Sequence, residues 1–493
     1  MKLNVAVQMD PIARINIRGD STFALLLEAQ KRGHAISYYT PEKLSLRGEQ
    51  LVASVQPLTV RDLQSLLDAK TLLLEYALGE ERSYLWVVSA TSVQSFTLPK
   101  RALIEETARR FYESLTARNQ PVSNESAEQK RNRIAQADVV SRQTGAQLSR
   151  WLLSPAGSLL GNKRLLIVSD GGLQYVPFAA LPAPTVATSP SGKPLPALKS
   201  LLATHELVSL PSASTLATLR HEQAQRAAAI APARKTVAVF ADPVFEAKDE
   251  RVKTVSLKAP SAAATDKEKP VSTPTVPTEP SRLLLYKSAK DSGAADRELR
   301  IPRLPFTRKE AEAILALTEK DQSRAAFDFA ANRTAISADD LGQYRLLHFA
   351  THGFLNSLNP ELSGLVLALV DEQGKPQNGY LLAPEIYNLK LPATDLVVLS
   401  ACQTGLGKEI RGEGMVGLTR GFMYAGAPRV VVSLWNVSDR ATADLMKAFY
   451  QSLLLKGERP AAALRSAQLQ LLQQKQWQAP YFWAAFSLQG EWR

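Results

Sequence analysis

Two residues of this chain, Cys402 and His352, are of the types that together carry out nucleophilic catalysis. Cys402 is the only cysteine, and His352 is one of five histidines. A thiol has an ordinary pKa of about 8.5 and is mostly protonated at neutral pH, so it needs a base or a cation nearby to react. An adjacent imidazole supplies either one, which makes this pair a candidate for covalent catalysis.

Both residues follow apolar runs that we predict to be β-strands. His352 comes just after the run 345–350, and Cys402 comes just after the run 396–400. Further apolar runs alternate with segments of helical spacing, which is typical of a parallel sheet with right-handed crossovers. Ligand and catalytic groups gather at the carboxyl ends of such strands. We therefore expect the imidazole and the thiol to face the same crevice.

Glycine follows the histidine directly, and this arrangement has a chemical use. Without a Cβ atom at Gly353, a substrate carbonyl can approach the backbone closely. The N–H groups of Gly353 and Cys402 are then candidate donors to an oxyanion. Structural alternatives stay open, because a cysteine after a buried strand is often an inert small hydrophobic residue and a histidine there is often a structural hydrogen-bonding group. We expect that structural role for His348.

Four stretches of the chain differ in character. Residues 1–62 predict a short strand–helix–strand unit, and residues 63–245 and 304–493 predict α/β bodies. Residues 246–303 carry five prolines within 258–281, which predicts an exposed, mobile linker. We expect strands at residues 3–8, 35–39, 71–76, 84–88, 164–169, 236–240, 345–350, 396–400 and 429–434, and helices at 21–32, 105–117, 128–153, 308–317, 441–454 and 460–474.

The composition is that of an ordinary globular protein. The chain has 493 residues, 45% of them hydrophobic and 22% charged, which excludes a fully disordered chain, a collagen and a coiled coil. The net charge of +12 is spread among acids rather than gathered in a basic stripe, so we expect no nucleic-acid partner. A single cysteine forms no intramolecular disulfide, and no apolar run is long enough to cross a membrane. We expect a cytoplasmic protein without a membrane partner.

Several motifs in the region from about residue 63 to residue 493 resemble those of a CHAT domain, a caspase-like cysteine peptidase module related to separase and the caspases. The matching segments are Leu72-Leu73-Leu74-Glu75-Tyr76, Leu165-Leu166-Ile167-Val168, Tyr175-Val176-Pro177-Phe178-Ala179-Ala180-Leu181-Pro182, His348-Phe349-Ala350-Thr351-His352-Gly353, Leu399-Ser400-Ala401-Cys402-Gln403-Thr404-Gly405, Gly412-Glu413-Gly414-Met415, Ala425-Gly426-Ala427, Ser433-Leu434-Trp435-Asn436-Val437-Ser438-Asp439 and Pro480-Tyr481-Phe482-Trp483-Ala484-Ala485-Phe486.

This resemblance implies a fold, a domain order and an activity. The fold is a caspase-like three-layer α/β/α arrangement with a mostly parallel sheet, in which a pseudo-caspase half (63–245) precedes an active half (304–493). His352 and Cys402 become the dyad of a cysteine endopeptidase, and their separation of 50 positions equals the spacing of about 50 in caspases. The chemistry needs no cofactor or metal. A non-catalytic interaction module with the same fold is the alternative hypothesis.

Residues 1–62 resemble the amino terminus of bacterial glutathione synthetase. The resemblance rests on Met9-Asp10-Pro11-Ile12, Ile15-Asn16-Ile17, Asp20-Ser21 and Phe23-Ala24-Leu25-Leu26-Leu27-Glu28-Ala29-Gln30. Nothing downstream resembles the ATP-grasp domain that would hold nucleotide and magnesium. We therefore expect an incomplete fragment without ligase activity.

A peptidase also needs residues that select its substrate and a means of controlling its activity. Glu413, in a glycine-rich stretch expected to form a mobile loop (404–417), and Asp439 are acids near the expected site. They are candidates for a pocket that accepts Lys or Arg before the cut bond, because charge-assisted hydrogen bonds favour a basic side chain there. The alternative for Asp439 is a helix cap. We expect a protein or peptide substrate and a latent enzyme, released by an activating partner or by processing within 246–303.

Overall fold

The contacts within the chain define two compact units, which are described separately. Unit 1 is Met1–Ala233 with Pro428–Arg493, and unit 2 is Arg234–Ala427. This grouping differs from the predicted halves, because residues 428–493 belong with the first unit rather than with 304–427. The structure, a computed structural model, describes residues 4–8, 35–39, 44–47, 50–53, 56–57, 59–120, 122–184, 199–229, 235–253, 300–337, 339–354, 362–400 and 413–493.

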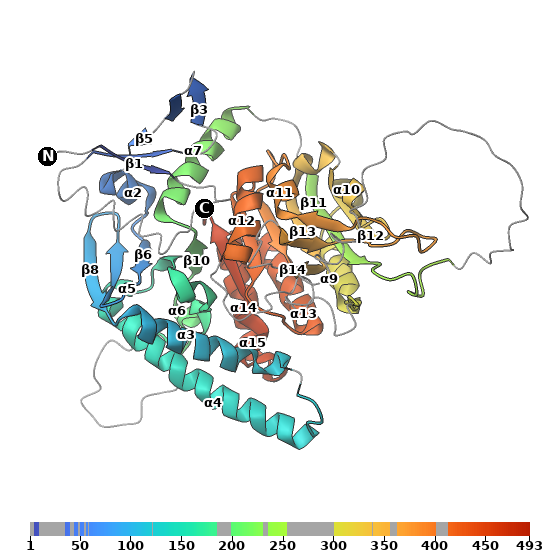
Figure 1. Ribbon diagram of the computed structural model, residues 1–493, viewed down its shortest axis with the longest axis horizontal. Helices are drawn as coiled ribbons and strands as arrows, with labels where there is room; N and C mark the ends of the chain where they lie inside the picture. The colour runs from blue at the N-terminus through green and yellow to red at the C-terminus, as the bar shows by residue number, and fades with distance from the viewer. Residues whose placement is uncertain are drawn as a thin grey trace, which may run out of the picture. The chain divides into compact units, whose positions relative to one another are not determined.

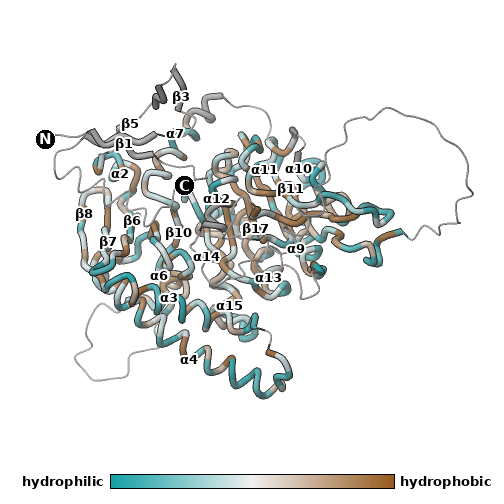
Figure 2. Tube along the Cα trace, in the orientation of Figure 1, coloured by the Kyte–Doolittle hydropathy of each residue, from teal (hydrophilic) through white to brown (hydrophobic). Residues whose placement is uncertain are grey.

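Unit 2 contains four neighbouring parallel strands, among them β11, β12 and β13, which are labelled in Figure 1. Their order is β12-β11-β13-β17, and each neighbouring pair is parallel. β13 and β17 are buried along almost their whole length, as expected for strands covered on both faces. Hydrophobic residues run along much of these strands (Figure 2). The bounds are β11 Lys235–Pro243, β12 Ser323–Asp328, β13 Tyr344–Ala350 and β17 Leu396–Leu399.

Helices cover both faces of this sheet, as two successive residues of β13 show. His348 accepts or donates a hydrogen bond of 2.8 Å with Glu310, on α9 (Pro305–Leu315). The ring of Phe349 packs against Phe422, on α12 (Glu413–Ala425), with centroids 5.8 Å apart. Because successive side chains of a strand point to opposite faces, α9 and α12 lie on opposite sides of the sheet. The structural role expected for His348 agrees with its complete burial.

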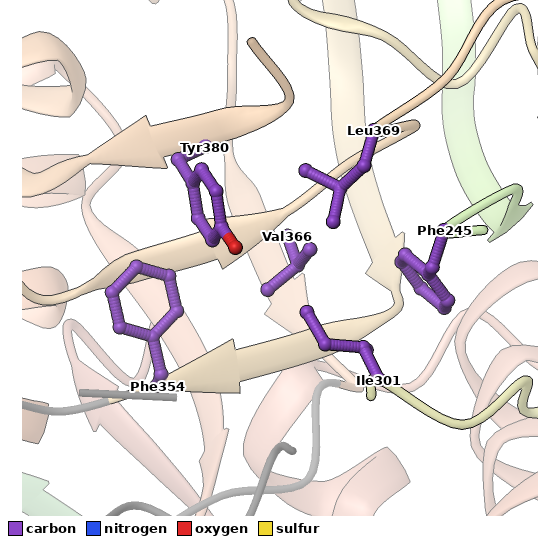
Figure 3. Packing of buried hydrophobic residues seen from close by; sticks show 6 residues of the cluster. All are labelled: Phe245, Ile301, Phe354, Val366, Leu369 and Tyr380. Atoms are coloured by element: carbon purple, nitrogen blue, oxygen red, sulfur yellow. The ribbon is translucent and has the colours of Figure 1, made fainter. Parts of the chain in front are cut away.

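A second, smaller sheet follows β13 directly. It is antiparallel, in the order β14-β15-β16, with β14 at His352–Phe354, β15 at Gly364–Val366 and β16 at Tyr380–Leu382. Its side chains form a buried cluster with Phe245 and Ile301 (Figure 3). The remaining α-helices of unit 2 in the described ranges are α10 (Arg333–Ser337) and α11 (Ala383–Tyr387).

Unit 1 contains a mixed sheet in the order β18-β19-β10-β9-β6-β7-β8. The pairs β10–β19, β9–β10 and β6–β9 are parallel, and the pairs β18–β19, β6–β7 and β7–β8 are antiparallel. The strands are β6 Thr71–Ala77, β7 Ser83–Val88, β8 Val93–Leu98, β9 Arg164–Val168, β10 Leu207–Leu210, β18 Arg429–Ser433 and β19 Phe486–Gly490, and the α-helices are α2 Val60–Leu66, α3 Arg101–Leu115, α4 Ala127–Leu152, α5 Gly157–Leu160, α6 Leu201–Thr204, α7 Ala213–Ala229, α13 Asp439–Tyr450, α14 Pro460–Gln473 and α15 Pro480–Trp483.

Direct contacts explain why residues 428–493 join unit 1. Strand β19 pairs with β10, and the Tyr112 hydroxyl donates to the carbonyl oxygen of Leu434 at 2.9 Å. Arg220 forms an ion pair of 2.6 Å with Glu491, whose side chain is buried. These pairings join residues more than 250 positions apart, so local sequence patterns did not reveal them.

The predicted α/β class with a mostly parallel sheet is confirmed, and most predicted elements are present with ends shifted by a few residues. The predicted strands 3–8 and 35–39 appear as β1 (Asn4–Gln8) and β2 (Ala35–Tyr39), which pair in parallel. The remaining short strands of this region are β3 (Leu44–Arg47), β4 (Gln50–Ala53) and β5 (Gln56–Pro57). The helix predicted at 21–32 lies outside the described residues. No helix in the described ranges is long and apolar enough to span a membrane.

The prediction of an exposed linker over 246–303 is wrong at the carboxyl end and only partly right at the amino end, where residues such as Lys248 and Glu250 are exposed. Ile301 is only 3% exposed and belongs to the core cluster of unit 2. Arg251 forms ion pairs with Asp242, Asp249 and Asp328. The prolines within 258–281 led to the prediction of a linker over the whole range 246–303. The described residues at its two ends do not have such a composition. Residues 254–299 lie outside the described residues.

Shortening Phe349 tests the three-layer packing of unit 2. Its fully buried ring stacks on Phe240 with centroids 5.1 Å apart, so Phe349→Ala should lower the free energy of unfolding by about 3–5 kcal/mol. Tyr424→Ala, at a side chain that is 53% exposed on α12, is the control and should change it by about 0.5 kcal/mol or less. Chemical denaturation measures both, and equal losses would contradict the packing described.

Candidate functional site

The strands that precede the two predicted catalytic residues are direct neighbours. β13 and β17 pair in parallel, with Phe349 opposite Leu399. His352 comes three residues after Phe349, and Cys402 comes three residues after Leu399. The two segments therefore leave the same edge of the sheet at the same level. Cys402 itself, with the rest of 401–412, lies outside the described residues.

His352 is buried, and a hydrogen bond to Pro302 holds it in place. The chain bends at Thr351 after β13, and His352 then begins the short strand β14 with only 5% of its surface exposed. Its Nε2 lies 2.7 Å from the carbonyl oxygen of Pro302, and the ring of Phe245 is tilted against the imidazole with centroids 5.5 Å apart. A carbonyl oxygen only accepts, so this contact assigns the proton to Nε2.

The opposite ring nitrogen, Nδ1, then carries the lone pair of the neutral imidazole. Nδ1 makes no hydrogen bond to a residue within the described parts of the chain. Burial lowers the pKa of His352 to about 4, while the hydrogen bond to Pro302 opposes this shift. At neutral pH the side chain is therefore an uncharged imidazole that can accept a proton at Nδ1.

Unit 2 contains a pocket of about 340 Å³ that shares lining residues with the surroundings of His352. Two of its lining residues, Phe245 and Pro302, are the residues that contact His352. The lining carries side chains of both charges beside apolar ones, which suits a polar or charged side chain of a ligand. The lining residues are Phe245, Glu246, Lys248, Asp249, Arg300, Ile301, Pro302 and Arg303.

A buried carboxylate that was not predicted, Asp242, lies at the end of β11. The register with β12 shifts between Ala241 and Pro243, so Asp242 is the bulged residue, and its positive φ of 51° is one that aspartate tolerates better than most residues. Its side chain is fully buried and forms ion pairs with Arg251, Arg303 and Arg308.

The other predicted site residues are placed as follows. Gly353 lies beside His352 in β14, opposite Leu365. Glu413 is the first residue of α12, so residues 413–417 begin a helix rather than continue the expected loop, and the Glu413 side chain is outside what the structure describes. Asp439 is the first residue of α13 in unit 1 and does not cap it, because the N-cap position is Ser438. The capping alternative for Asp439 is therefore wrong.

Asp242 and Pro302 were not predicted as site residues, and the sequence gives a clue for only one of them. Asp242 follows an apolar strand at its carboxyl end, as His352 does, so the rule that identified the histidine could also have found it. Pro302 acts through a backbone carbonyl, which every residue has, and its type gives no hint of that contact. Within the described ranges, no group of three or more His, Cys, Asp or Glu residues could hold a metal ion.

Comparison with protein families gives two matches. The CHAT domain matches residues 142–491, which is more than half of the chain, and the N-terminal domain of prokaryotic glutathione synthetase matches residues 3–85. Glutathione synthetase of Bradyrhizobium diazoefficiens is 86% identical over 62 residues, which are 13% of this chain and 20% of that protein. The chain thus spans about a fifth of the length of the glutathione synthetases that it matches.

The solved structures that match this chain include a separase–securin complex and an Arg-specific cysteine proteinase. The separase of the Saccharomyces cerevisiae separase–securin complex matches 87% of this chain and 30% of its own, with 10% identity and a TM-score of 0.47. The Arg-specific cysteine proteinase gingipain R matches 79% of this chain and 74% of its own, with 10% identity and a TM-score of 0.37.

Titration of His352 tests the geometry of its environment. Because its pKa is lower in the folded chain (about 4) than in the unfolded chain (6.5), its contribution to stability is complete above pH 6.5 and is lost as the pH falls towards 4. Histidine NMR signals recorded between pH 4 and 8 should include an imidazole that stays neutral at pH 6 and is absent in His352→Gln; burial also lowers the pKa of His205, whose signal should remain in that variant. A His352 pKa near 6.5 would contradict the buried environment.

Proposed function

Because the chain belongs to the CHAT domain family, we propose that it is a cysteine endopeptidase whose dyad is His352 and Cys402. One observation carries this proposal. A neutral imidazole, with its proton fixed on Nε2 and its lone pair on Nδ1, follows a strand whose direct neighbour leads to the only cysteine. A thiol needs such a base to become a nucleophile at neutral pH.

In the proposed reaction, Nδ1 of His352 takes the proton of the Cys402 thiol. The thiolate attacks the carbonyl carbon of the substrate, and the N–H groups of Gly353 and Cys402 stabilise the oxyanion that forms. His352 then gives its proton to the leaving amine, and water hydrolyses the thioester to release the second product. The carbonyl of Pro302 stabilises the imidazolium that exists between these steps, because it accepts the Nε2–H hydrogen bond throughout.

We propose that the side chain before the cut bond is basic. Glu246 lines the pocket that contains the His352 contacts Phe245 and Pro302, and the cations Lys248, Arg300 and Arg303 line the same pocket. We propose that the Glu246 carboxylate binds a substrate lysine or arginine there. Glu413, which lies in unit 2 with His352, remains a proposed contributor to this preference. Glu246 was missed because it falls at the start of the stretch expected to be a linker.

Labelling with peptide chloromethyl ketones tests the dyad. A probe with arginine before the reactive group should modify Cys402, and the rate should fall by about a hundredfold or more in His352→Ala, because the thiol then lacks its base. A matched probe with aspartate in place of arginine should react more slowly. Mass spectrometry of tryptic peptides identifies the modified residue and measures the rate.

His205→Ala is the control, because His205 is a buried histidine of unit 1 that bonds to the carbonyl of Lys163. It should leave the labelling rate unchanged. If Cys402 reacts only at the rate of a small free thiol, and equally in His352→Ala, the dyad is absent. The alternative, a module that binds peptides without cutting them, would then be favoured.

We also propose that the enzyme is latent. Binding of an activating partner, or a proteolytic cut within residues 246–303, would activate it. Within this stretch Lys258, Lys267, Lys269 and Arg282 are basic residues of the kind that the pocket is proposed to accept. Purified active protein should therefore contain fragments with new amino termini within 254–299, which terminal sequencing detects. Full activity from an intact chain without a partner would exclude latency.

A further inference from the structure

Segment 300–304 touches the carboxyl edge of the unit 2 sheet through three successive residues. The side chain of Ile301 is buried in the cluster with Phe354 and Val366, and it points toward Val366 (Figure 3). Pro302 supplies the carbonyl that accepts from His352. Arg303 extends to the carboxylate of Asp242 at the end of β11.

The contact between Arg303 and Asp242 is forked. Nε of Arg303 donates to Oδ1 of Asp242 and Nη2 donates to Oδ2, both at 2.9 Å. Such a two-bond pair fixes orientation as well as distance. The Asp242 side chain is fully buried, whereas that of Arg303 is 35% exposed. Arg303 also pairs with Glu250 at 2.9 Å, but the Glu250 side chain is 81% exposed, so the buried Asp242 is the fixed partner of the two.

Asp242 itself is fixed from other directions. Arg251 reaches its carboxylate at 3.1 Å and also donates to its backbone oxygen at 2.8 Å. Arg308, on α9, reaches the same carboxylate at 3.3 Å. A buried carboxylate with several charge-assisted partners is a rigid anchor, because moving it would leave charges unpaired.

The position of Arg303 determines where the Pro302 carbonyl points. The carbonyl of Pro302 and the nitrogen of Arg303 belong to one planar peptide unit, so they move together. The proline ring restricts φ on the other side of this unit. Fixing Arg303 therefore fixes the acceptor that keeps the proton of His352 on Nε2.

We propose that the ion pair between Asp242 and Arg303 is a positioning device that holds the Pro302 carbonyl against His352 and thereby keeps Nδ1 of His352 available for the thiol. Asp242 and Arg303 are positioning residues in this arrangement, since neither contacts the imidazole. The inference rests on the proposed role of His352 in catalysis. It adds a specific function for two charged residues remote from the dyad in sequence.

The variants Arg303→Lys and Arg303→Gln test this device in the full-length chain. Lysine keeps the charge but cannot form the fork, and glutamine removes the charge. Arg333→Lys is the matched control, because Arg333 is 34% exposed and pairs with Glu385, elsewhere in unit 2. Circular dichroism and thermal unfolding identify the variants that fold, and Arg303→Lys keeps the test possible if Arg303→Gln does not.

The first readout is the ¹⁵N NMR signature of His352 at pH 7, assigned by its loss in His352→Gln. The parent chain and Arg333→Lys should show the tautomer with the proton on Nε2. Arg303→Lys should show a mixture of both tautomers, since its acceptor is no longer held. An unchanged Nε2–H tautomer in the folded Arg303 variants would overturn the inference.

The second readout is hydrolysis of a peptide with arginine before the cut bond. In Arg303→Lys, kcat should fall about tenfold or more, because misplacement of the base affects the chemical step. The test uses kcat alone, since Arg303 also lines the pocket proposed for the substrate and its replacement can change KM. Equal losses of kcat in Arg303→Lys and Arg333→Lys would contradict the device. If no variant and no parent chain hydrolyses peptides, the proposed function fails while the tautomer measurement still decides this inference.

Discussion

The hydrogen bond from Nε2 of His352 to the carbonyl of Pro302 is the contact on which the site depends. At 2.7 Å it is a good hydrogen bond, and it gives a buried imidazole the partner that burial demands. It also sets the tautomer, and so decides which nitrogen can act as a base. Loss of this bond would leave a buried donor unpaired and would free the ring to turn.

The fold provides the rest of the geometry through its strand order. Parallel pairing brings the ends of β11, β13 and β17 to one edge of the sheet. Each of these ends carries or leads to a residue whose side chain can take part in the proposed chemistry. Asp242 stands at the first end and His352 follows the second, while the third leads to Cys402. Because α9 and α12 cover the two faces, this edge is where polar groups can gather without disturbing the core.

The sequence predicted the parts of this account that depend on residue type and local pattern. An apolar strand followed by histidine, and its neighbour followed by cysteine, are both visible in a short window. Three features needed contacts between distant residues: the carbonyl of Pro302, the fork of Arg303 on Asp242, and the pairing of β19 with β10 that places residues 428–493 in unit 1. Ile301 was wrongly predicted to be exposed because it lies in a segment whose overall composition is that of a linker. Its burial depends on contacts with residues distant in sequence, which composition does not show.

The central claim is that Cys402 and His352 meet at the edge of one sheet, and a crystal structure that includes residues 401–412 tests it most directly. The account predicts that Sγ of Cys402 lies within about 4 Å of Nδ1 of His352, or comes that close when a peptide inhibitor is bound. A separation of more than about 8 Å in both the free and the inhibited chain would contradict it.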